Sequence, residues 1–542
     1  MLKKLHGRKL AVCLIGGAIY ALFSAFGWQA EHGGVIWAGG ALLVAALLVW
    51  PIAALLAVLL ERGYTRTLRQ EKTFRAGRAF AFMLACYVPM FCVAFPGSFA
   101  YDVPYQLRQV VTGAYSTHHP LLHTLALGGL LQLGRALGDI NLGAALYTAL
   151  QMALLAGCFA LTCGSIARQS GARAAKRAAV FFALYPLNTV MAVNATKDVL
   201  FGGFFALTLA LLNEIQEKPS RGLSLKIAAC GALAVMLRNN MAYAALVWLA
   251  LLTIGLRKGK KSAALAMLLA LAVGLCGNAA LKRATRAESG DMSEMLSWPI
   301  QQLARARLYD EDRLTDAEKE AIDELMPGEA WACYDPTISD PVKFEFDTQA
   351  FRADVKKYVG VWLSVGKKCA GTYLDATMAL TYPFFYPYRE YRVSGYYVQM
   401  GMSDAYDAGW CDFDPPESRS LFPRALASLS WRFGAKGAMQ IPVVGWLFNM
   451  GVIVWTMLFF ALREMYWGRW RRFGTALLPV LLWGTFLLGP VMAGRYIYPF
   501  VCALPVLAAR PGRIVNVNGK VSDTQESQIP AGIRGGYRHE IG

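Results

Sequence analysis

The chain has 542 residues, of which 56% are hydrophobic and only 17% are charged, and its formal net charge is +18. A soluble domain of this size does not need so much apolar surface, so the composition excludes an ordinary soluble protein. The positive charge is therefore interpreted by its position along the chain, because basic residues of membrane proteins accumulate in cytoplasmic loops.

Apolar runs of about 15 to 25 residues recur along the sequence, which is the length that a helix needs to cross a bilayer. Basic residues cluster between alternate runs, at 3–9, 62–78, 168–177, 218–221, 257–261 and 463–472. We predict that these clusters are cytoplasmic. The corresponding spans are expected at 10–28, 35–60, 79–95, 143–166, 178–193, 199–214, 225–237, 241–256, 261–281, 441–462, 474–492 and 495–509.

The segment 121–137 is apolar enough to be counted as a further span. Counting it would place the basic cluster 168–177 on the outer side, against the charge pattern. We therefore predict two interfacial helices, at 104–112 and 121–137, within an outer loop at 96–140.

These assignments predict an all-α polytopic membrane protein with about 12 transmembrane helices. Both termini are expected to be cytoplasmic, in the cytoplasmic membrane of a bacterium. The expected parts are an N-terminal transmembrane domain (1–281), a mostly α-helical extracytoplasmic domain (282–440), C-terminal transmembrane helices (441–510) and a cytoplasmic tail (511–542). Within the hydrophilic domain, the amphipathic segment 357–380 is expected to rest on the membrane surface.

Eight of the eleven cysteines fall in apolar runs, where cysteine behaves as a small hydrophobic residue. The other three, Cys333, Cys369 and Cys411, allow at most one disulfide bond on the outer side. No cysteine pair has the spacing of a metal site.

Ionisable residues gather at the predicted outer ends of the spans, where a charge is costly and often functional. The alternative for each is a structural role, such as pairing with a neighbour or reaching toward the headgroups. The candidates for substrate binding or catalysis are Asp102, His118, His119, Lys197, Asp198, Arg238, Asn239, Arg495 and Tyr496.

Each candidate suggests a particular chemistry. Asp102 follows a span in the loop PGSFAYD and is a candidate general base, unless it only caps the loop beside Pro104. His118 and His119 could bind phosphate, relay protons or ligate a metal. Arginine offers a fixed fork of donors to phosphate oxygens, which favours Arg238 and Arg495 as ligands of a lipid phosphate.

Lys197 and Asp198 could instead form only a local pair that caps the following span. The aromatic run 381–397 is explained most simply as an interfacial belt, with sugar stacking as the alternative.

The motifs FPGSFAYDVPYQLRQVVTGAYSTHHPLLHT, ATKDVLF, RNN, SWPIQQLAR, SDPVK and GRYIYP resemble those of a bacterial family of multispan proteins similar to the GT-C glycosyltransferase superfamily. The resemblance extends from about residue 80 to about residue 505. It implies sugar transfer from a polyprenyl-phosphate donor at the outer membrane face, with Asp102 in the place of the catalytic acid. Many such enzymes carry a second acid beside the first, whereas Tyr101 and Val103 flank Asp102, so a divalent cation cofactor is possible but not implied by the sequence.

The resulting hypothesis is an inverting membrane glycosyltransferase with Asp102 as general base and Arg238, Arg495 and Lys197 around the leaving lipid phosphate. The expected partners are a polyprenyl-phosphate-linked sugar, a glycan, lipid or protein acceptor of the cell envelope, and membrane lipids, with no nucleic acid. The alternative function is a transporter or flippase of a lipid-linked glycan. A scaffold for envelope assembly would need no polar cluster.

Sidedness gives the first testable prediction. Single cysteines introduced at 98–118 and 300–350 should react with a membrane-impermeant maleimide added from outside, because these segments are expected to be extracytoplasmic. Cysteines at 170–176 should react only after the membrane is opened. Labelling of 170–176 in intact cells would contradict the topology, and the candidate residues would then no longer lie on one side of the membrane.

Overall fold

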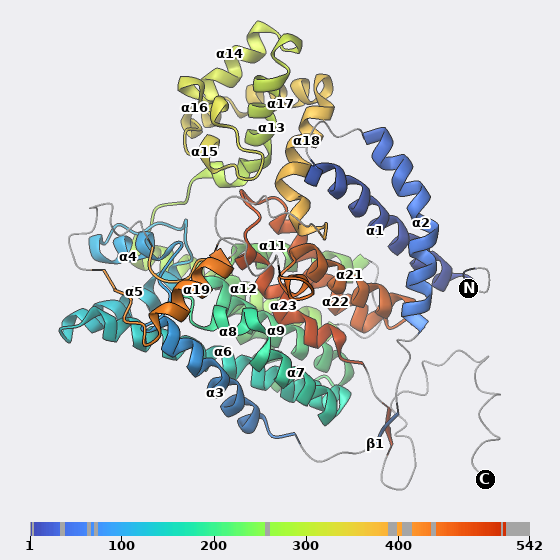
Figure 1. The fold of residues 1–542 in the computed structure, drawn as a ribbon, viewed down its shortest axis with the longest axis vertical. Coiled ribbons are helices and arrows are strands. Elements are labelled where there is room, and N and C mark those ends of the chain that lie inside the picture. Colours follow the sequence, from blue (N-terminus) through green and yellow to red (C-terminus); the bar gives the residue numbers. More distant parts are fainter. Residues whose placement is uncertain are drawn as a thin grey trace.

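The computed structural model describes residues 2, 5–32, 38–61, 67–69, 74–254, 261–387, 398–403, 415–434, 441–510 and 513–515. Most of the regular structure in these ranges is α-helical (Figure 1). The strands β1 (Thr67–Arg69) and β2 (Arg513–Val515) form one short parallel pair. The prediction of a predominantly helical chain is therefore confirmed.

The N-terminal part of the chain consists of a succession of helices with short connections. They are α1 (Arg8–His32), α2 (Ala38–Glu61), α3 (Ala76–Ala94), α4 (Val103–Thr112), α5 (Leu121–Ala136), α6 (Ile140–Ser170), α7 (Ala172–Leu184), α8 (Pro186–Ala192), α9 (Lys197–Glu217), α10 (Arg221–Leu237), α11 (Asn239–Ile254) and α12 (Lys261–Thr285).

The rest of the chain begins with shorter elements and ends with longer helices. The shorter elements are η2 (Met292–Leu296), α13 (Ser297–Tyr309), η3 (Glu311–Arg313), α14 (Asp316–Leu325), η4 (Pro327–Cys333), α15 (Asp340–Lys343), α16 (Thr348–Ala353), α17 (Val355–Lys368), α18 (Ala370–Thr381), η5 (Tyr382–Phe384), α19 (Pro423–Gly434) and η7 (Val444–Leu447). The last three helices are α21 (Met450–Tyr466), α22 (Trp470–Phe486) and α23 (Gly494–Ala508).

Six helices, α1, α2, α3, α6, α9 and α12, are long and apolar enough to cross a membrane. Shorter apolar helices occur at 239–252 and 494–508. Large apolar side chains of α2 are exposed, for example Leu43 and Leu47, and such a surface is unfavourable in water. These helices indicate a membrane protein, whereas the count of twelve spans remains a prediction.

Two expected spans differ from single continuous helices. The expected span 178–193 is divided between α7 and α8 at Tyr185 and Pro186, because proline disfavours a helical residue before it. The expected span 441–462 becomes regular α-helix only at Met450. There Asn449 caps α21 by accepting a hydrogen bond from the backbone N–H of Val452 (3.1 Å).

The helices α9 and α23 lie side by side in the centre of the bundle. A Cβ atom at Gly202 of α9 would lie 3.0 Å from Cys502 Sγ and 3.1 Å from the Tyr498 ring, both in α23. Only a glycine allows this close approach without displacing the neighbouring helix. Both helices begin at the same end of the bundle, where they carry Lys197 and Arg495.

The opposite ends of α9 and α23 contact the basic segments that were predicted to be cytoplasmic. Arg168 pairs with Glu214 near the end of α9 (2.6 Å), and Arg463 donates a hydrogen bond to the carbonyl oxygen of Leu507 near the end of α23 (2.7 Å). The candidate site and these basic segments therefore lie at opposite ends of the same two helices. This separation is what the predicted sidedness requires.

A small helical domain with its own core follows α12. Ile300 of α13, Ile322 of α14 and Val365 of α17 are among its buried residues. Figure 1 shows α13–α17 grouped at one end of the molecule, with α18 leading from them to the bundle. The helix α18 packs against both α13 and α1 and thus joins the two parts.

The segment 357–380 forms two helices. It is divided at Cys369 into α17, which packs in the core of the helical domain through Tyr358 and Val365, and α18. Val359 and Leu363 of α17 remain exposed, so the expected contact of this segment with the membrane surface stays a prediction.

The predicted extracytoplasmic domain 282–440 also does not fold as one unit. The backbone N–H groups of Arg419 and Leu421 donate hydrogen bonds to the carbonyl oxygens of Phe95 and Cys92 (2.9 and 3.1 Å), and α19 packs against α3. Residues 415–434 thus return to the bundle, as Figure 1 shows for α19.

Helices are present at both expected positions, as α4 and α5, whereas their place at the membrane interface stays a prediction. The helix α5 packs closely on α6. A Cβ atom at Gly134 of α5 would lie 2.4 Å from the backbone nitrogen of Gly143 and 2.7 Å from its Cα atom. The backbones of α5 and α6 therefore meet at this crossing, which fixes the loop that carries the candidate site.

Gly134→Ala should therefore lower the free energy of unfolding by about 1 to 3 kcal/mol, because the new methyl group must displace backbone atoms. Gly129→Ala, in the same helix with nothing within 4 Å of its Cβ position, is the matched control. It should be neutral or stabilising by up to about 1 kcal/mol. Thermal unfolding of both variants in detergent checks this, and equal midpoints would contradict the close crossing.

Candidate functional site

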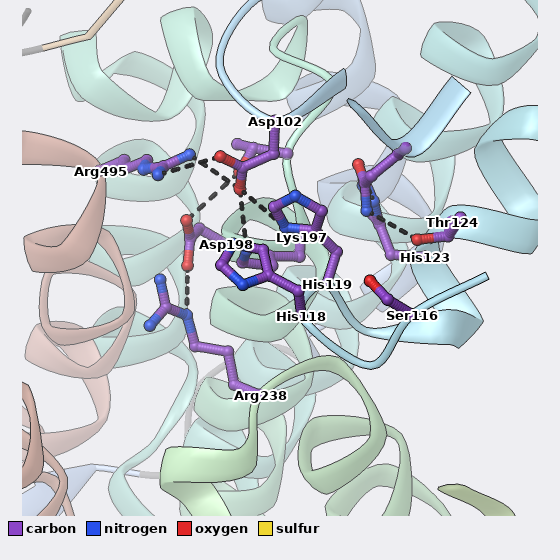
Figure 2. A network of polar contacts seen from close by, with 12 residues as sticks. Asp102, Ser116, His118, His119, His123, Thr124, Lys197, Asp198, Arg238 and Arg495 are labelled. Carbon is purple, nitrogen blue, oxygen red and sulfur yellow. Dashed lines mark hydrogen bonds and ion pairs between the residues drawn. The ribbon is translucent and has the colours of Figure 1, made fainter. Parts of the chain in front are cut away.

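Asp102 lies just before α4 and joins three separate parts of the chain. Lys197 Nζ at the start of α9 is 2.8 Å from Asp102 Oδ2. The Arg495 guanidinium at the start of α23 contacts both carboxylate oxygens, with Nη1 3.2 Å from Oδ2 and Nη2 3.3 Å from Oδ1. Figure 2 shows the two cations converging on this carboxylate.

A second ion pair lies directly beside the first. Arg238 Nε, at the C-terminal end of α10, is 2.5 Å from Asp198 Oδ1, and the Asp198 side chain is fully buried. Thr196 Oγ1 donates a hydrogen bond to the other Asp198 oxygen (3.2 Å). Lys197 and Asp198 are adjacent at the start of α9. Lys197 belongs to the ion pair with Asp102, and Asp198 belongs to the ion pair with Arg238.

Aromatic rings support the two arginines. The Arg238 guanidinium carbon is 4.7 Å from the ring centroids of both Phe486 and Tyr496. The corresponding carbon of Arg495 is 4.5 Å from the Tyr101 ring centroid and 5.1 Å from that of Tyr496. Tyr496 thus lies between the two guanidinium groups, where cation–π contacts restrict their orientation.

The loop before Asp102 is held by residues from much later in the chain. Tyr101 has a φ of 54°, a left-handed conformation that is uncommon for tyrosine. Its backbone N–H donates to Gln399 Oε1 (3.3 Å), and its hydroxyl group accepts from the backbone N–H of Gln399. The backbone N–H of Phe99 donates to the carbonyl oxygen of Gly401 (2.9 Å). These contacts fix the direction in which Asp102 points.

The three histidines of this region have different surroundings. His119 is buried, with Nδ1 3.7 Å from Asp102 Oδ2, whereas the side chain of His118 is 42% exposed and lies 4.0 Å from Glu294. His123 is buried within α5 and contacts Tyr147 (2.9 Å) and Gln106 (3.1 Å) through its two ring nitrogens.

The neighbouring charges determine the protonation state of Asp102. Burial alone would raise the pKa of its carboxyl group, but Arg495 and Lys197 outweigh burial and hold this pKa well below its usual range. Asp102 is therefore an anion in the structure as it stands. A carboxylate held in this way is a weak base until another anion draws the two cations away.

The site carries more positive than negative side-chain charge. Lys197, Arg238 and Arg495 face Asp102 and Asp198. Two buried guanidinium nitrogens, Arg238 Nη2 and Arg495 Nε, have no hydrogen-bond partner within the described ranges. Buried donors without partners are costly, so this arrangement is suited to an anionic ligand.

The structure brings together six of the nine sequence candidates: Asp102, Lys197, Asp198, Arg238, Arg495 and Tyr496. His119 lies at their edge, and His118 points to the surface beside Glu294. Asn239 does not join the site, because it is exposed at the start of α11. Its neighbour Asn240 instead donates a hydrogen bond to Thr485 Oγ1 (3.1 Å).

No sequence pattern pointed to the supporting residues Tyr101, Phe486 and Gln399. Tyr101 was visible only as a neighbour of Asp102, and aromatic residues are too frequent in this chain to single out Phe486. The contact with Gln399 joins residues about 300 positions apart, and no local pattern predicts it.

Two sequence predictions fall partly or wholly outside the described residues. The aromatic run 381–397 is described only to residue 387, and Cys411 also lies outside. Cys333 is exposed and Cys369 is buried, and both are free thiols.

A divalent cation does not fit the side chains around Asp102. Both carboxylate oxygens already face positively charged groups, which would repel a metal ion. Over the described part of the chain, no three His, Cys, Asp or Glu residues form a group able to hold a metal.

Asp102→Asn should lower the free energy of unfolding by about 2 kcal/mol near neutral pH, because Lys197 and Arg495 lose a charged hydrogen-bond partner. The folded-state pKa of Asp102 is depressed, so its stabilising effect is complete above about pH 4, the ordinary aspartate value. The stability difference from wild type should shrink as the pH falls below that value.

Thermal unfolding in detergent between about pH 3 and pH 7 measures this difference across the ordinary aspartate pKa. The control is Asp312→Asn, an exposed carboxylate of the helical domain, which should change stability by less than about 0.5 kcal/mol. A stability difference that does not depend on pH would contradict the assigned charge state of Asp102.

Comparison with known protein families gives one match. The model described as "Family of unknown function (DUF6020)" matches residues 111–513. Comparisons with curated proteins and with solved structures give no match. The matched segment contains the site residues from His118 to Tyr496, whereas Asp102 precedes it. Since the segment covers well over half of the sequence, the chain belongs to the DUF6020 family.

Proposed function

We propose that this chain is a membrane glycosyltransferase that transfers a sugar from a polyprenyl-phosphate donor to a cell-envelope acceptor. The observation that carries the proposal is that Lys197 and Arg495 both form ion pairs with Asp102, directly beside the ion pair between Asp198 and Arg238. A candidate base and a set of phosphate-binding cations thus share one group of side chains. Sugar transfer from a lipid phosphate needs both.

The donor phosphate would compete with Asp102 for the same cations. Lys197 and Arg495 lower the pKa of Asp102, so the carboxylate is a weak base in the free protein. A phosphate that accepts hydrogen bonds from these two side chains reduces their effect on Asp102, and the pKa of Asp102 then rises. The base would become effective only when the donor is bound.

In the transfer step, the acceptor hydroxyl oxygen attacks the anomeric carbon of the donor sugar. The bond from this carbon to the phosphate oxygen breaks, and its electron pair leaves with the lipid phosphate. The hydroxyl proton passes to Asp102. Arg238, Arg495 and Lys197 stabilise the negative charge that grows on the phosphate, and the attack inverts the anomeric configuration.

The position of the site favours an enzyme over a carrier. Carriers with alternating access usually place their binding site near the middle of the membrane. Here the charged group lies where α9 and α23 begin, and the basic segments predicted to be cytoplasmic contact the other ends of these helices. The proposal includes a GT-C-like fold of twelve spans, with both termini in the cytoplasm and the site at the outer face.

The direct test supplies a panel of polyprenyl-phosphate sugars to the purified protein in liposomes, together with envelope acceptors. Free polyprenyl phosphate should appear as a product, and Asp102→Asn should abolish its formation. If lipids move between the leaflets while no donor is consumed for any sugar or acceptor, the chain is a carrier.

Arg495→Lys tests the role of the guanidinium group. Lysine keeps the positive charge but loses the pair of guanidinium N–H groups that can bind two phosphate oxygens at once. This bidentate contact stabilises the negative charge that grows on the phosphate in the transition state. Turnover should fall by about 10- to 100-fold, with a change in donor affinity of less than about threefold.

The matched control is Arg419→Lys, which alters an exposed arginine paired with Asp139. It should leave both turnover and donor affinity unchanged. An Arg495→Lys variant that loses affinity but keeps wild-type turnover would show that Arg495 only binds the donor.

A further inference from the structure

The buried imidazole of His119 has an unusual position beside the candidate base. Its Nδ1 atom is 3.7 Å from Asp102 Oδ2, and it has no hydrogen-bond partner in the described portions of the chain. The separation is too long for a hydrogen bond, but a small rotation of either side chain would close it. Figure 2 shows the ring between Asp102 and His118.

His118, the preceding residue, lies between His119 and the protein surface. The ring centroids of His118 and His119 are 4.6 Å apart, and the planes are nearly perpendicular. The side chain of His118 is 42% exposed, and its Nδ1 atom lies 4.0 Å from Glu294. The dipeptide therefore extends from the partly buried carboxylate of Asp102 to the solvent.

A general base must lose its proton before the next reaction cycle. Lys197 and Arg495, which contact Asp102 directly, carry protons already and cannot accept another. Asp198 is engaged by Arg238. His119 is the neutral base next to Asp102 among the described side chains of this group.

We infer that His119 receives the proton from Asp102 after sugar transfer and passes it through His118 to the solvent. The inference rests on the proposed function. In this sequence the acceptor O–H bond breaks, the proton binds Asp102, and it then moves to Nδ1 of His119. The net products are the glycosylated acceptor, the lipid phosphate and one released proton.

The electrostatics agree with this order of events. Burial, followed by the charge of Lys197, lowers the pKa of His119 to about 3, so its imidazole is neutral in the free protein and becomes a better proton acceptor when a nearby anion raises this pKa. Arg495 and His118 act in the same direction, whereas Asp102 opposes them. A lipid phosphate beside Lys197 adds negative charge, which raises the pKa of His119 and favours its protonated form.

The first measurement follows His119 by ¹⁵N NMR of histidine-labelled protein in lipid nanodiscs. The chain has six histidines, so the signal that disappears in His119→Gln assigns the residue. The probe is undecaprenyl phosphate. Its binding should raise the pKa of His119 by at least about 1 unit, as expected for an opposite charge placed nearby.

The second measurement uses turnover with the donor found in the liposome assay. His119→Gln should lower turnover by about 100-fold without changing the donor KM, because the amide cannot carry the proton. Exogenous imidazole should restore part of the activity. The control His32→Gln alters an exposed histidine that contacts Trp28, and it should change nothing.

The outcomes separate the two proposals. If undecaprenyl phosphate does not bind to the wild-type protein, the proposed function fails and the proton path fails with it. If the lipid binds but the pKa of His119 stays within about 0.3 unit of its free value, only the proton path is rejected. Wild-type turnover of His119→Gln would also reject the path and leave the transferase proposal intact.

Discussion

The partly buried pairing of Asp102 with Lys197 and Arg495 is the interaction on which the arrangement of this protein depends. A charge removed from water without a partner costs several kcal/mol. The loop before α4 and the first residues of α9 and α23 must therefore meet at one point. This requirement fixes one end of two central helices and positions the candidate site at that end.

The aromatic rings around the two arginines add to this constraint. Tyr496 contacts both guanidinium groups, and Tyr101 and Phe486 each contact one. A ring face restricts a planar cation, and the Tyr496 hydroxyl also accepts a hydrogen bond from Arg495 Nη2 (3.3 Å). Arg238 Nη2 and Arg495 Nε have no hydrogen-bond partner among the described residues and stay available for an anion. The contact of Tyr101 with Gln399 connects the loop to the chain that follows the helical domain, and thus links that part to the site.

Much of the helical framework follows from local sequence. Apolar runs, proline positions and capping residues act over a few residues, and for that reason α4 and α5 lie within one residue of their expected bounds. The charge pattern along the chain also indicated which polar residues share one end of the bundle. The break at Cys369 and the return of residues 415–434 were not predicted, because the surface on which each apolar side packs lies far away in the sequence.

The sequence by itself thus determined the class of protein and the candidates Asp102, Lys197, Asp198, Arg238, Arg495 and Tyr496. The tertiary structure alone decided their pairing, with Arg238 on Asp198 and Arg495 on Asp102. It also turned His119 inward and His118 outward, and left Asn239 exposed. The physical reason is that helix formation depends on neighbouring residues. Ion pairing between helices depends on which faces meet after packing, and no local pattern specifies those faces.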